Sequence, residues 1–468
     1  MSMARTSRSF LCVCCLTLVL ASLVQAQTFT TMVNFFGADG ANPQASLIQG
    51  TDGALYGTTV NGGAGGCWCG TLFRITTQGS LVGFPLNTHD GTGPTTSLLL
   101  GTDGNYYGTT RADGAYGLGT VFKITPAGVL TKLHDFCADQ NDCLDGYRPN
   151  ELVQGFDGNL YGTAAFGSDY SCSGGCGTVF TITQSGSFTT LYRFSGSDGD
   201  HPMGRLVQGL DSSLYGVTDE GGGLGTVFRI TPTGVFTNLH TFDGTDGMFP
   251  EGGLILASDG GFYGTTYGGG PSNDGTLFRI APTGRFTTLH HFNSTANQPY
   301  SELVQGSDRN LYGTTYYGGD QNCDYPEGCG SIYRFGTDGS FTILHNFESA
   351  DGQFPMAGLV QATNGVFYGM VPEGGNGTYG TLYSLDMGLD PFVTFVRNAG
   401  KAGSVASILG QNLTGTSAVA FNGTSGSFTV ASDTLIYATV PPGATTGYVT
   451  VTTPTGTLMS NKQFVVVR

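Results

Sequence analysis

The chain has 468 residues and a formal net charge of −16, and only 11% of its residues are charged. This negative charge disfavours binding to nucleic acids or to anionic membranes. Glycine accounts for 78 residues, about twice average usage, whereas hydrophobic residues at 39% and aromatic residues at 12% suffice for a core. The composition excludes a disordered chain and predicts a turn-rich globular protein.

The N-terminal segment, residues 1–26, has the features of a secretory signal peptide. Arg5 and Arg8 supply the positive charge, residues 10–24 form an apolar run, and residues 24–26 give a small-residue cleavage site. A transmembrane anchor is the alternative, but the run is short for a bilayer span, which takes about 20 residues. We therefore expect the mature chain, residues 27–468, to be secreted, extracellular or at the cell surface, without a membrane span. Loss of the two arginines would move its formal charge from −16 to −18.

Of the 11 cysteines, three would leave with the signal peptide, and the remaining eight fall into close pairs. An even count in a secreted chain predicts disulfides, each bridging a single loop. A zinc site is the alternative, but no pair has a second pair or a histidine at ligand spacing, so we expect no metal there. It stays open whether Cys67 and Cys69 form a disulfide with each other, because a bridge across one intervening residue demands strained geometry. The pairs are Cys67/Cys69, Cys137/Cys143, Cys172/Cys176 and Cys323/Cys329.

A unit of about 50 residues is repeated seven times along the chain. Its centre is the stretch Leu-Tyr-Gly-Thr-Thr at positions 55–59, and its tyrosine recurs at nearly even intervals. This period is the signature of a repeat architecture and not of a catalytic motif. The seven tyrosines are Tyr56, Tyr107, Tyr161, Tyr215, Tyr263, Tyr312 and Tyr368.

Each copy contains four short β-like runs, here called strands a to d, separated by turn residues. In the first copy, strand a is 46–50, strand b is 54–59 after an Asp-Gly turn, and strand c is 70–75. Strand d follows a second tight turn and is clearest at 286–292. Seven four-stranded units predict an all-β fold with a seven-bladed β-propeller. A β-helix has much shorter repeats, and separate domains would need a core that a unit of this size barely supplies.

The two ends of the repeat region predict how the ring closes. The seventh copy has strands a to c, ending at 381–385, and no strand d follows it. Residues 28–36 match strand d and precede the first strand a. We therefore predict that residues 28–36 pair with 381–385, so that both termini build the last blade and no sheet edge is left exposed.

The recurring pattern is Gly-x-Asp-Gly-x-Leu-Tyr-Gly-Thr-Thr, then Gly-Gly, then Gly-Thr-Val-Phe-Arg-Ile-Thr-Pro-x-Gly, then Leu-His-x-Phe. It resembles the GloVer repeat, a choice-of-anchor tandem repeat of secreted bacterial proteins, over roughly residues 28–389. The resemblance implies a propeller-like exported protein, and it brings no activity and no catalytic residues.

After residue 389 the period stops, and residues 390–468 show short alternating strands and turns that predict a small β-sandwich. The order of their motifs is similar to that of the IPT/TIG family of immunoglobulin-like domains, which implies a spacer or contact module. Its few basic residues give no support to the DNA binding of some members of that fold; they are Arg397, Lys401, Lys462 and Arg468. The expected organisation is a signal peptide at 1–26, a propeller at 27–389 and an Ig-like domain at 390–468.

Residues found in nearly every copy are explained by the architecture. The aspartates of the a–b turns are interpreted as turn formers. The histidines at one position of strand d are interpreted as packing or hydrogen-bonding residues; they are His134, His240, His290 and His345. The aspartates of the d–a connections shape their loops, with calcium as an alternative because Asp-rich turns supply oxygen ligands. No other cofactor is expected.

Positions at which the copies differ are free to form a site. The residue before the first leucine of strand a is Glu151, Arg205 or Glu302 in three copies and Ser or Gly in the others. Since the innermost strand of a propeller lines its channel, these side chains would face the channel mouth. They could bind a polar ligand, act as acid and base in glycoside chemistry, or simply be solvated channel residues. The variable b–c and d–a loops share one face, which also carries Trp68, the only tryptophan.

These observations predict an exported, monomeric, non-enzymatic binding or cell-surface interaction protein whose partner is an extracellular glycan or protein. The alternative is an extracellular polysaccharide lyase or glycoside hydrolase that uses Glu151, Glu302 and Arg205. Motifs of serine hydrolases, phosphate-binding loops and zinc peptidases are absent from the sequence.

Overall fold

The computed structural model of the chain describes residues 27–139, 142–168, 171–323 and 326–467. All regular secondary structure in these ranges is β-strand, as the repeat predicts. The described residues contain no helix that is long and apolar enough to cross a membrane. The predicted signal peptide, residues 1–26, lies outside the described residues.

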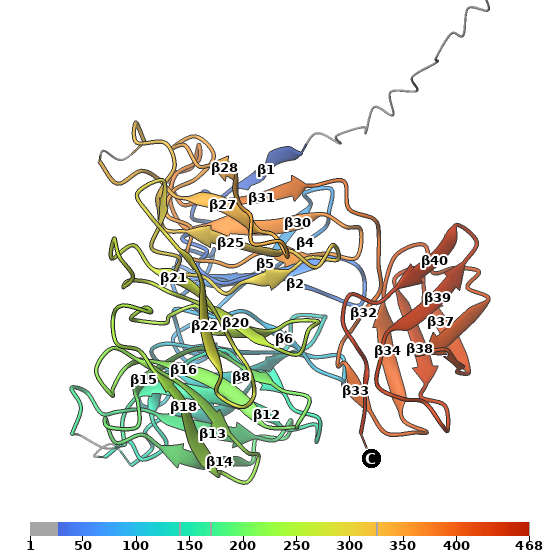
Figure 1. Cartoon of the computed structure of the whole chain (residues 1–468), viewed down its shortest axis with the longest axis horizontal. Helices are drawn as coiled ribbons and strands as arrows, with labels where there is room; N and C mark the ends of the chain where they lie inside the picture. The colour runs from blue at the N-terminus through green and yellow to red at the C-terminus, as the bar shows by residue number, and fades with distance from the viewer. Residues whose placement is uncertain (1–26, 140–141, 169–170, 324–325, 468) are drawn as a thin grey trace, which may run out of the picture.

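Seven antiparallel sheets, numbered here from 1 to 7 along the chain, follow the seven copies of the repeat (Figure 1). Sheets 1 to 3 contain β2 (Ile48–Gln49), β3 (Leu55–Thr59), β4 (Thr71–Ile75) and β5 (Leu81–Pro85); β6 (Leu99–Leu100), β7 (Tyr106–Thr110), β8 (Thr120–Ile124) and β9 (Leu130–Asp135); and β10 (Tyr147–Pro149), β11 (Val153–Gln154), β12 (Leu160–Phe166), β13 (Thr178–Ile182) and β14 (Phe188–Arg193). Sheets 4 and 5 contain β15 (Asp200–Gln208), β16 (Leu214–Glu220), β17 (Thr226–Ile230) and β18 (Phe236–Thr241); and β19 (Leu254–Leu256), β20 (Phe262–Thr266), β21 (Thr276–Ile280) and β22 (Phe286–His291). Sheet 6 contains β24 (Val304–Gln305), β25 (Leu311–Thr315), β27 (Ser331–Phe335) and β28 (Phe341–Asn346), beside the short ribbon of β23 (Ala296–Asn297) and β26 (Tyr317–Gly318).

Sheet 7 joins the two ends of the repeat region. It consists of β29 (Val360–Gln361), β30 (Phe367–Val371), β31 (Thr381–Asp386) and the N-terminal β1 (Thr28–Asn34). Strand β1 pairs with β31 in antiparallel register, from Thr28 opposite Asp386 to Asn34 opposite Thr381, with a bulge between Thr31 and Val33. The predicted pairing of the two termini is confirmed.

Side-chain packing joins the sheets to one another in sequence. Each pair of consecutive sheets shares a cluster of buried apolar side chains, as where Tyr107 of sheet 2 belongs to one cluster with Phe180 of sheet 3. A further cluster contains Phe73 of sheet 1 together with Tyr368 and Leu382 of sheet 7. Sheet 7 therefore packs on sheet 1 as well as on sheet 6.

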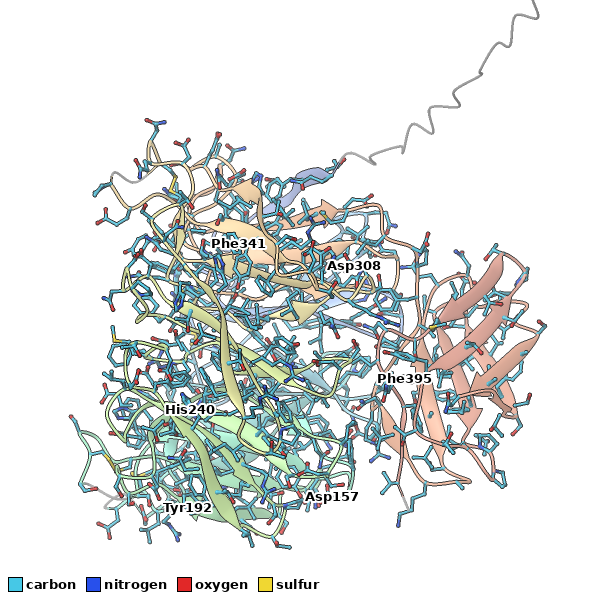
Figure 2. The ribbon with its side chains drawn as sticks, in the orientation of Figure 1. Asp157, Tyr192, His240, Asp308, Phe341 and Phe395 are labelled. Carbon is cyan, nitrogen blue, oxygen red and sulfur yellow. A yellow bond between two sulfur atoms is a disulfide. The ribbon has the colours of Figure 1, made fainter. Side chains whose placement is uncertain are left out.

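The repeated Tyr-Gly pair is explained by the packing inside each sheet. In the first six copies the tyrosine hydroxyl donates to the aspartate four residues before it, at 2.7–3.1 Å, so the turn aspartate also satisfies a largely buried phenol. The glycine allows the third strand to approach, since a Cβ at Gly57 would lie 2.6 Å from Cζ of Phe73. Figure 2 shows two of these aspartates, Asp157 and Asp308, on the side of the sheets that faces the C-terminal segment.

The histidines of the fourth strand fasten neighbouring sheets together. His134, His240 and His345 each contact a loop aspartate through Nε2 at 2.8–2.9 Å, and each ring stacks on a phenylalanine of the next sheet at 3.7–3.9 Å. The ring that stacks on His345 is Phe29 of β1, so the N-terminal strand occupies the same place as the fourth strands of the other sheets. These contacts support the packing interpretation of the histidines.

Residues 394–466 form two further four-stranded sheets around one core. The strands are β32 (Thr394–Phe395), β34 (Val405–Leu409), β38 (Leu435–Thr439) and β37 (Phe428–Ser432) in one sheet, β36 (Thr424–Ser425), β35 (Ala418–Phe421), β39 (Val449–Thr453) and β40 (Gly456–Met459) in the other, and a parallel pair of β33 (Ala399–Gly400) and β41 (Val465–Val466). Ile408 and Ile436 of the first sheet pack with Val419 and Val451 of the second.

The C-terminal sheets lie against the tight-turn side of the repeats (Figure 1). The hydroxyl of Thr434 donates to the carbonyl oxygen of Thr51 at 2.7 Å, and Leu409 and Leu435 extend the apolar cluster between sheets 1 and 2. The opposite side of the repeats carries the long b–c and d–a loops, which we call the loop face.

Candidate binding site

The structure pairs two of the three residues that the sequence predicts at the channel. Nη2 of Arg205, in β15, lies 2.7 Å from Oε1 of Glu302, which lies two residues before β24, the first strand of sheet 6. The Glu302 carboxylate raises the pKa of Arg205, and burial raises the pKa of Glu302 although Arg205 opposes that effect. The two side chains keep 34% and 15% of their exposure, so solvent still reaches the pair.

Glu151 has a different partner. Its Oε1 accepts hydrogen bonds from the backbone amide of Ser97 at 3.1 Å and from the Ser97 hydroxyl at 2.8 Å. Its charge still acts on the Arg205–Glu302 pair, raising the pKa of both groups. The three residues therefore form one electrostatic group, but each carboxylate already has a partner within the protein.

The C-terminal segment adds a charge to this group. Lys462, between β40 and β41, lowers the pKa of Glu302, while its own pKa is lowered by burial and by Arg205. The inner residues of neighbouring sheets also approach closely here, since a Cβ at Gly252 would lie 2.3 Å from the carbonyl oxygen of Ser301. The predicted site thus lies in a narrow region that the C-terminal sheets approach from the tight-turn side.

A second group of polar side chains lies where strands reach the loop face. Asp219 is near the end of β16, and Glu251 and Tyr300 each follow a proline in a d–a loop. Burial, reinforced by the neighbouring Glu251, raises the pKa of Asp219 to about 7. Burial also raises the pKa of Glu251, against a side-chain hydrogen bond with Tyr300. Oδ1 of Asp219 is buried without a hydrogen-bond partner in the described part of the chain.

Aromatic rings surround this group on one side. The centroids of Tyr267 and Tyr300 are 6.2 Å apart, those of Tyr300 and Tyr316 are 6.3 Å apart, and those of Tyr316 and Phe354 are 5.3 Å apart. Arg111, an exposed residue from sheet 2, acts electrostatically on Tyr300. We call Arg111, Asp219, Glu251, Tyr300 and these neighbouring rings the mouth site.

Most of these residues come from one position of the repeat, at which the copies carry different residues. The residue after the Tyr-Gly-Thr-Thr stretch differs in nearly every copy and carries a large or charged side chain in four of them. The principle that variable positions are free to form a site would also have indicated this position. The sequence analysis applied that principle only to the residue before strand a. The seven residues are Val60, Arg111, Ala165, Asp219, Tyr267, Tyr316 and Pro372.

Backbone strain marks the rim of the same face. In every copy the residue before the loop proline has a left-handed backbone, with φ between 51° and 62°, and only one of the seven is glycine. Left-handed backbone at other residues costs about 1–3 kcal/mol, and because it recurs in every copy it belongs to the architecture of the repeat. The seven are Asn42, Gly93, Arg148, His201, Phe249, Gln298 and Phe354.

The cysteines lie in the loops of the same face. All eight described cysteines form the four predicted disulfides, including the pair that was in doubt, and they supply no free thiolate for a metal. The bridges are Cys67–Cys69, Cys137–Cys143, Cys172–Cys176 and Cys323–Cys329.

Cys329 corrects the expectation that each bridge serves a single loop alone. Its side chain is fully buried and belongs to the apolar cluster between sheets 6 and 7, together with Phe347 and Tyr383. Its Sγ also accepts a hydrogen bond from Nε2 of Gln353 at 3.1 Å. The reason is its place in the chain, since Cys329 lies just before β27 and enters the core with that strand. The bridge to Cys323 therefore ties a loop to the packing between two sheets.

Trp68 lies between the first two cysteines and is 51% exposed. Its ring centroid lies 5.8 Å from that of Tyr379. Trp68 comes from sheet 1 and Tyr379 from sheet 7, so the pair crosses the junction between the first and last copies. The predicted position of Trp68 on the loop face agrees with these contacts, but Trp68 is not part of the mouth site.

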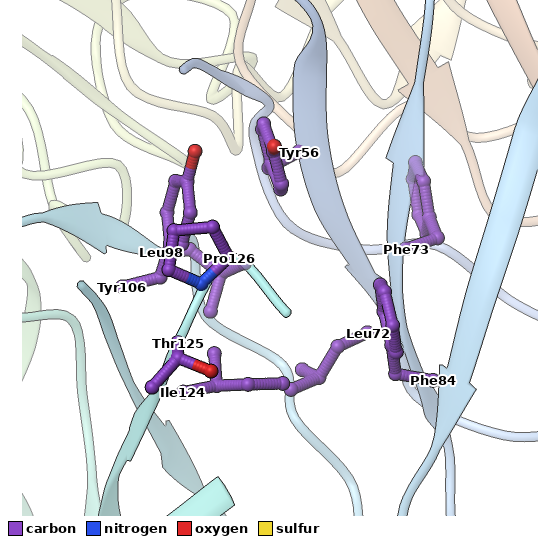
Figure 3. A pocket seen from close by; sticks show the side chains of 9 residues that line it. All are labelled: Tyr56, Leu72, Phe73, Phe84, Leu98, Tyr106, Ile124, Thr125 and Pro126. Atoms are coloured by element: carbon purple, nitrogen blue, oxygen red, sulfur yellow. The ribbon is translucent and has the colours of Figure 1, made fainter. Parts of the chain in front are cut away.

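Two hollows lie away from the mouth site. One is a gap of about 10 Å³ between sheets 1 and 2, lined by rings such as Tyr56, Phe84 and Tyr106 (Figure 3). This volume is about that of one water and its lining is mostly apolar, so it is a packing gap. The other is a groove of about 360 Å³ between the turn at Gln305–Arg309 and C-terminal residues that include Tyr448 and Met459.

The fold and the loop-face residues define an all-β repeat protein built from four-stranded antiparallel sheets. The sequence profile of the Gloeobacter/Verrucomicrobia repeat matches residues 19–144, 138–325 and 294–452. The chain therefore belongs to this repeat family, in agreement with the predicted GloVer repeat. No curated protein matches the chain in sequence.

Similar solved structures share little sequence with the chain. A gluconolactonase from Xanthomonas campestris is 13% identical, with 62% of this chain and 88% of that chain covered and a TM-score of 0.39. A protein of unknown function from Bacteroides thetaiotaomicron is 13% identical, with 77% and 76% covered and a TM-score of 0.43. TolB from Acinetobacter baumannii is 15% identical, with 60% and 61% covered and a TM-score of 0.36. At these values the likenesses carry no inference about activity.

Proposed function

We propose that the seven sheets are the blades of a β-propeller spanning residues 27–389 and that residues 390–468 form an Ig-like domain of the IPT/TIG type. The packing of sheet 7 on both sheet 6 and sheet 1 supports a closed ring. The two C-terminal sheets around one core support a sandwich. We further propose that the protein is exported, as the disulfides and the sequence of the N-terminal segment 1–26 favour, and that it is monomeric.

We propose that the protein is a non-enzymatic binding protein that holds an extracellular glycan on its loop face. The observation that carries this proposal is the mouth site, in which half-buried tyrosines stand beside Asp219, Glu251 and Arg111. A sugar ring offers apolar C–H faces to aromatic rings and hydroxyl groups to carboxylates and guanidinium groups, so it matches both parts of the site. The C-terminal domain lies on the other side and leaves the loop face accessible.

The alternative is a polysaccharide lyase or glycoside hydrolase with Glu151, Glu302 and Arg205 as its catalytic residues. Such an enzyme needs one carboxyl group to give a proton and another to act as base or nucleophile. Glu302 is paired with Arg205 at 2.7 Å and Glu151 accepts two hydrogen bonds from Ser97, which favours a structural role for both. Binding without turnover is therefore better supported than catalysis by these three residues.

A glycan array and a turnover screen on the mature protein, residues 27–468, test the proposal. The Tyr300→Ala variant should lose binding of any glycan that the wild type retains, because it removes the ring at the centre of the mouth site. Tyr437→Ala is the matched control, since Tyr437 is an exposed tyrosine of the C-terminal sheets, at 45% exposure, and should leave binding unchanged.

Three results would contradict the proposal. Turnover of a glycan that is lost in Glu302→Gln would establish the enzyme instead. A binding loss caused equally by both tyrosine variants would remove the mouth site from the explanation. The absence of glycan binding, together with saturable binding to a purified extracellular protein, would make the partner a protein.

A further inference from the structure

Three side chains at the edge of sheet 4 converge outside the mouth site: Asp200, His201 and Glu220. Asp200 begins β15 and lies opposite Glu220, the last residue of β16, in the antiparallel register. One ligand atom from each of the three lies within 4.8 Å of those of the other two. We propose that these residues bind a divalent transition-metal ion, with Zn²⁺ as the best match.

The Asp200 carboxylate is the part of the cluster that the protein alone does not satisfy. The residue is only 8% exposed, and its Oδ1 is buried without a hydrogen-bond partner in the described part of the chain. This oxygen faces the His201 ring, with Nε2 at 3.6 Å. A buried polar atom without a partner costs about 1–3 kcal/mol, and a bound cation would remove that cost.

The His201 ring is held in position by its surroundings. Nε2 lies 3.2 Å from the carbonyl oxygen of Ser173, so Nε2–H donates to it and Nδ1 keeps its lone pair. Nδ1 is 3.9 Å from Oε2 of Glu220, a separation that one metal ion can bridge. The ring also packs against Phe166, with centroids 4.4 Å apart. His201 has a left-handed backbone with φ of 51°, as does the equivalent residue of every other copy.

The remaining charges favour a cation and an open site. The groups that act on Asp200 are His201 and Glu220, and Asp219 adds a third carboxylate nearby. Three protein ligands would leave at least one coordination position to solvent or to a ligand, and Glu220 keeps 54% of its side-chain exposure. The neighbouring Cys172 and Cys176 form a disulfide and supply no thiolate.

The donor set selects the class of metal. An imidazole nitrogen with two carboxylates suits Zn²⁺ and similar transition metals, whereas Ca²⁺ prefers six to eight oxygen ligands. The inference differs from the calcium alternative drawn from the loop aspartates. Asp198, the loop aspartate two residues before Asp200, already accepts hydrogen bonds from the Ser195 amide and from the Tyr192 hydroxyl.

The test uses the mature full-length protein, freed of metal by a chelator and kept without reductant so that the disulfides stay intact. Titration with Zn²⁺ in a calorimeter should give one site, and Co²⁺ should give the visible absorption of a bound ion. Glu220→Gln, at an exposed position that should not disturb folding, should weaken Zn²⁺ binding at least tenfold. Asp200→Asn should abolish it, with circular dichroism to verify the fold.

His240→Gln is the matched control, because His240 faces Asp246 at 2.9 Å in the same sheet and lacks a third ligand in the described residues. It should leave Zn²⁺ binding unchanged. The inference fails if the wild type binds no Zn²⁺, if Glu220→Gln binds as tightly as the wild type, or if His240→Gln removes binding. Equal affinity for Ca²⁺ would overturn the choice of metal class. The test is independent of glycan binding, so its failure would leave the proposed function untouched.

Discussion

The buried Phe35, which follows β1, permits a sharp test of how the N-terminal strand closes the repeat region. Its side chain is fully buried in the cluster between sheets 7 and 1, where its centroid lies 5.7 Å from that of Phe73. Its neighbour Phe36 is 62% exposed. The two residues have the same chemistry and nearly the same place in the chain, so the pair isolates the effect of burial.

Replacing Phe35 by alanine removes a large ring from a packed interface and leaves a cavity. Substitutions of this kind cost about 3–5 kcal/mol. At about 2 °C per kcal/mol for a large domain, Tm should fall by roughly 6–10 °C. Phe36→Ala should change the stability by less than about 0.5 kcal/mol, because its ring is mostly in solvent.

Thermal melts followed by circular dichroism, with urea unfolding as a second measure, compare both variants with the wild type. Deletion of residues 27–37 should lower Tm further, since it also removes the pairing with β31 and the stacking of Phe29 on His345. Equal effects of the two alanine variants would refute the reasoning. So would a truncated protein that melts like the full-length chain.

Three further predictions concern other parts of the chain. Burial and the adjacent His291 lower the pKa of His290 in the folded protein. The stability that neutral His290 contributes is therefore fully present above its ordinary pKa of about 6.5, and it is lost as the pH falls through the lowered folded-state pKa. His290→Tyr, which copies Tyr192 at the same position, should therefore reduce the drop in urea midpoint between pH 7.5 and pH 5, and an unchanged drop would contradict this. Glu302→Gln should destabilise the protein by about 1.5 kcal/mol. This is the low end for a hydrogen bond between charged groups, because Arg205 is partly exposed. A loss of stability no greater than in the exposed control Glu348→Gln would show that the Arg205–Glu302 pair contributes nothing. Thiol titration of the unfolded, unreduced mature protein should find no free cysteine, and peptide mapping should return four local bridges.

Local sequence chemistry predicted most of the fold because each copy of the repeat carries the same pattern of turn and strand residues. The Asp-Gly turns, the alternating apolar residues and the Tyr-Gly pair fix a four-stranded sheet without reference to distant residues. Counting the strands was enough to predict that residues 28–36 pair with 381–385, and the observed partners extend from Thr28–Asp386 to Asn34–Thr381. The pairing between the two ends of the repeat region could be predicted because the seventh copy lacked only strand d and residues 28–36 matched that strand.

The candidate site was less accessible from the sequence. The position before strand a gave Glu151, Arg205 and Glu302, but their spacing does not reveal that Arg205 and Glu302 pair or that Ser97 holds Glu151. Those partners come from different sheets, and Lys462 comes from the C-terminal segment. Side-chain partners across sheets depend on the rotation between neighbouring sheets, which no single copy of the repeat records.

The sequence by itself determined the all-β class, the number of repeats, the pairing of the two ends and the cysteine pairs, because each rests on short-range patterns or on counting. Only the tertiary structure decided which loop residues meet, as Asp219 meets Glu251 and Asp200 meets His201 and Glu220. It also decided that Cys329 lies in the core between two sheets. The physical reason is that packing between sheets brings together residues whose separations in sequence carry no period.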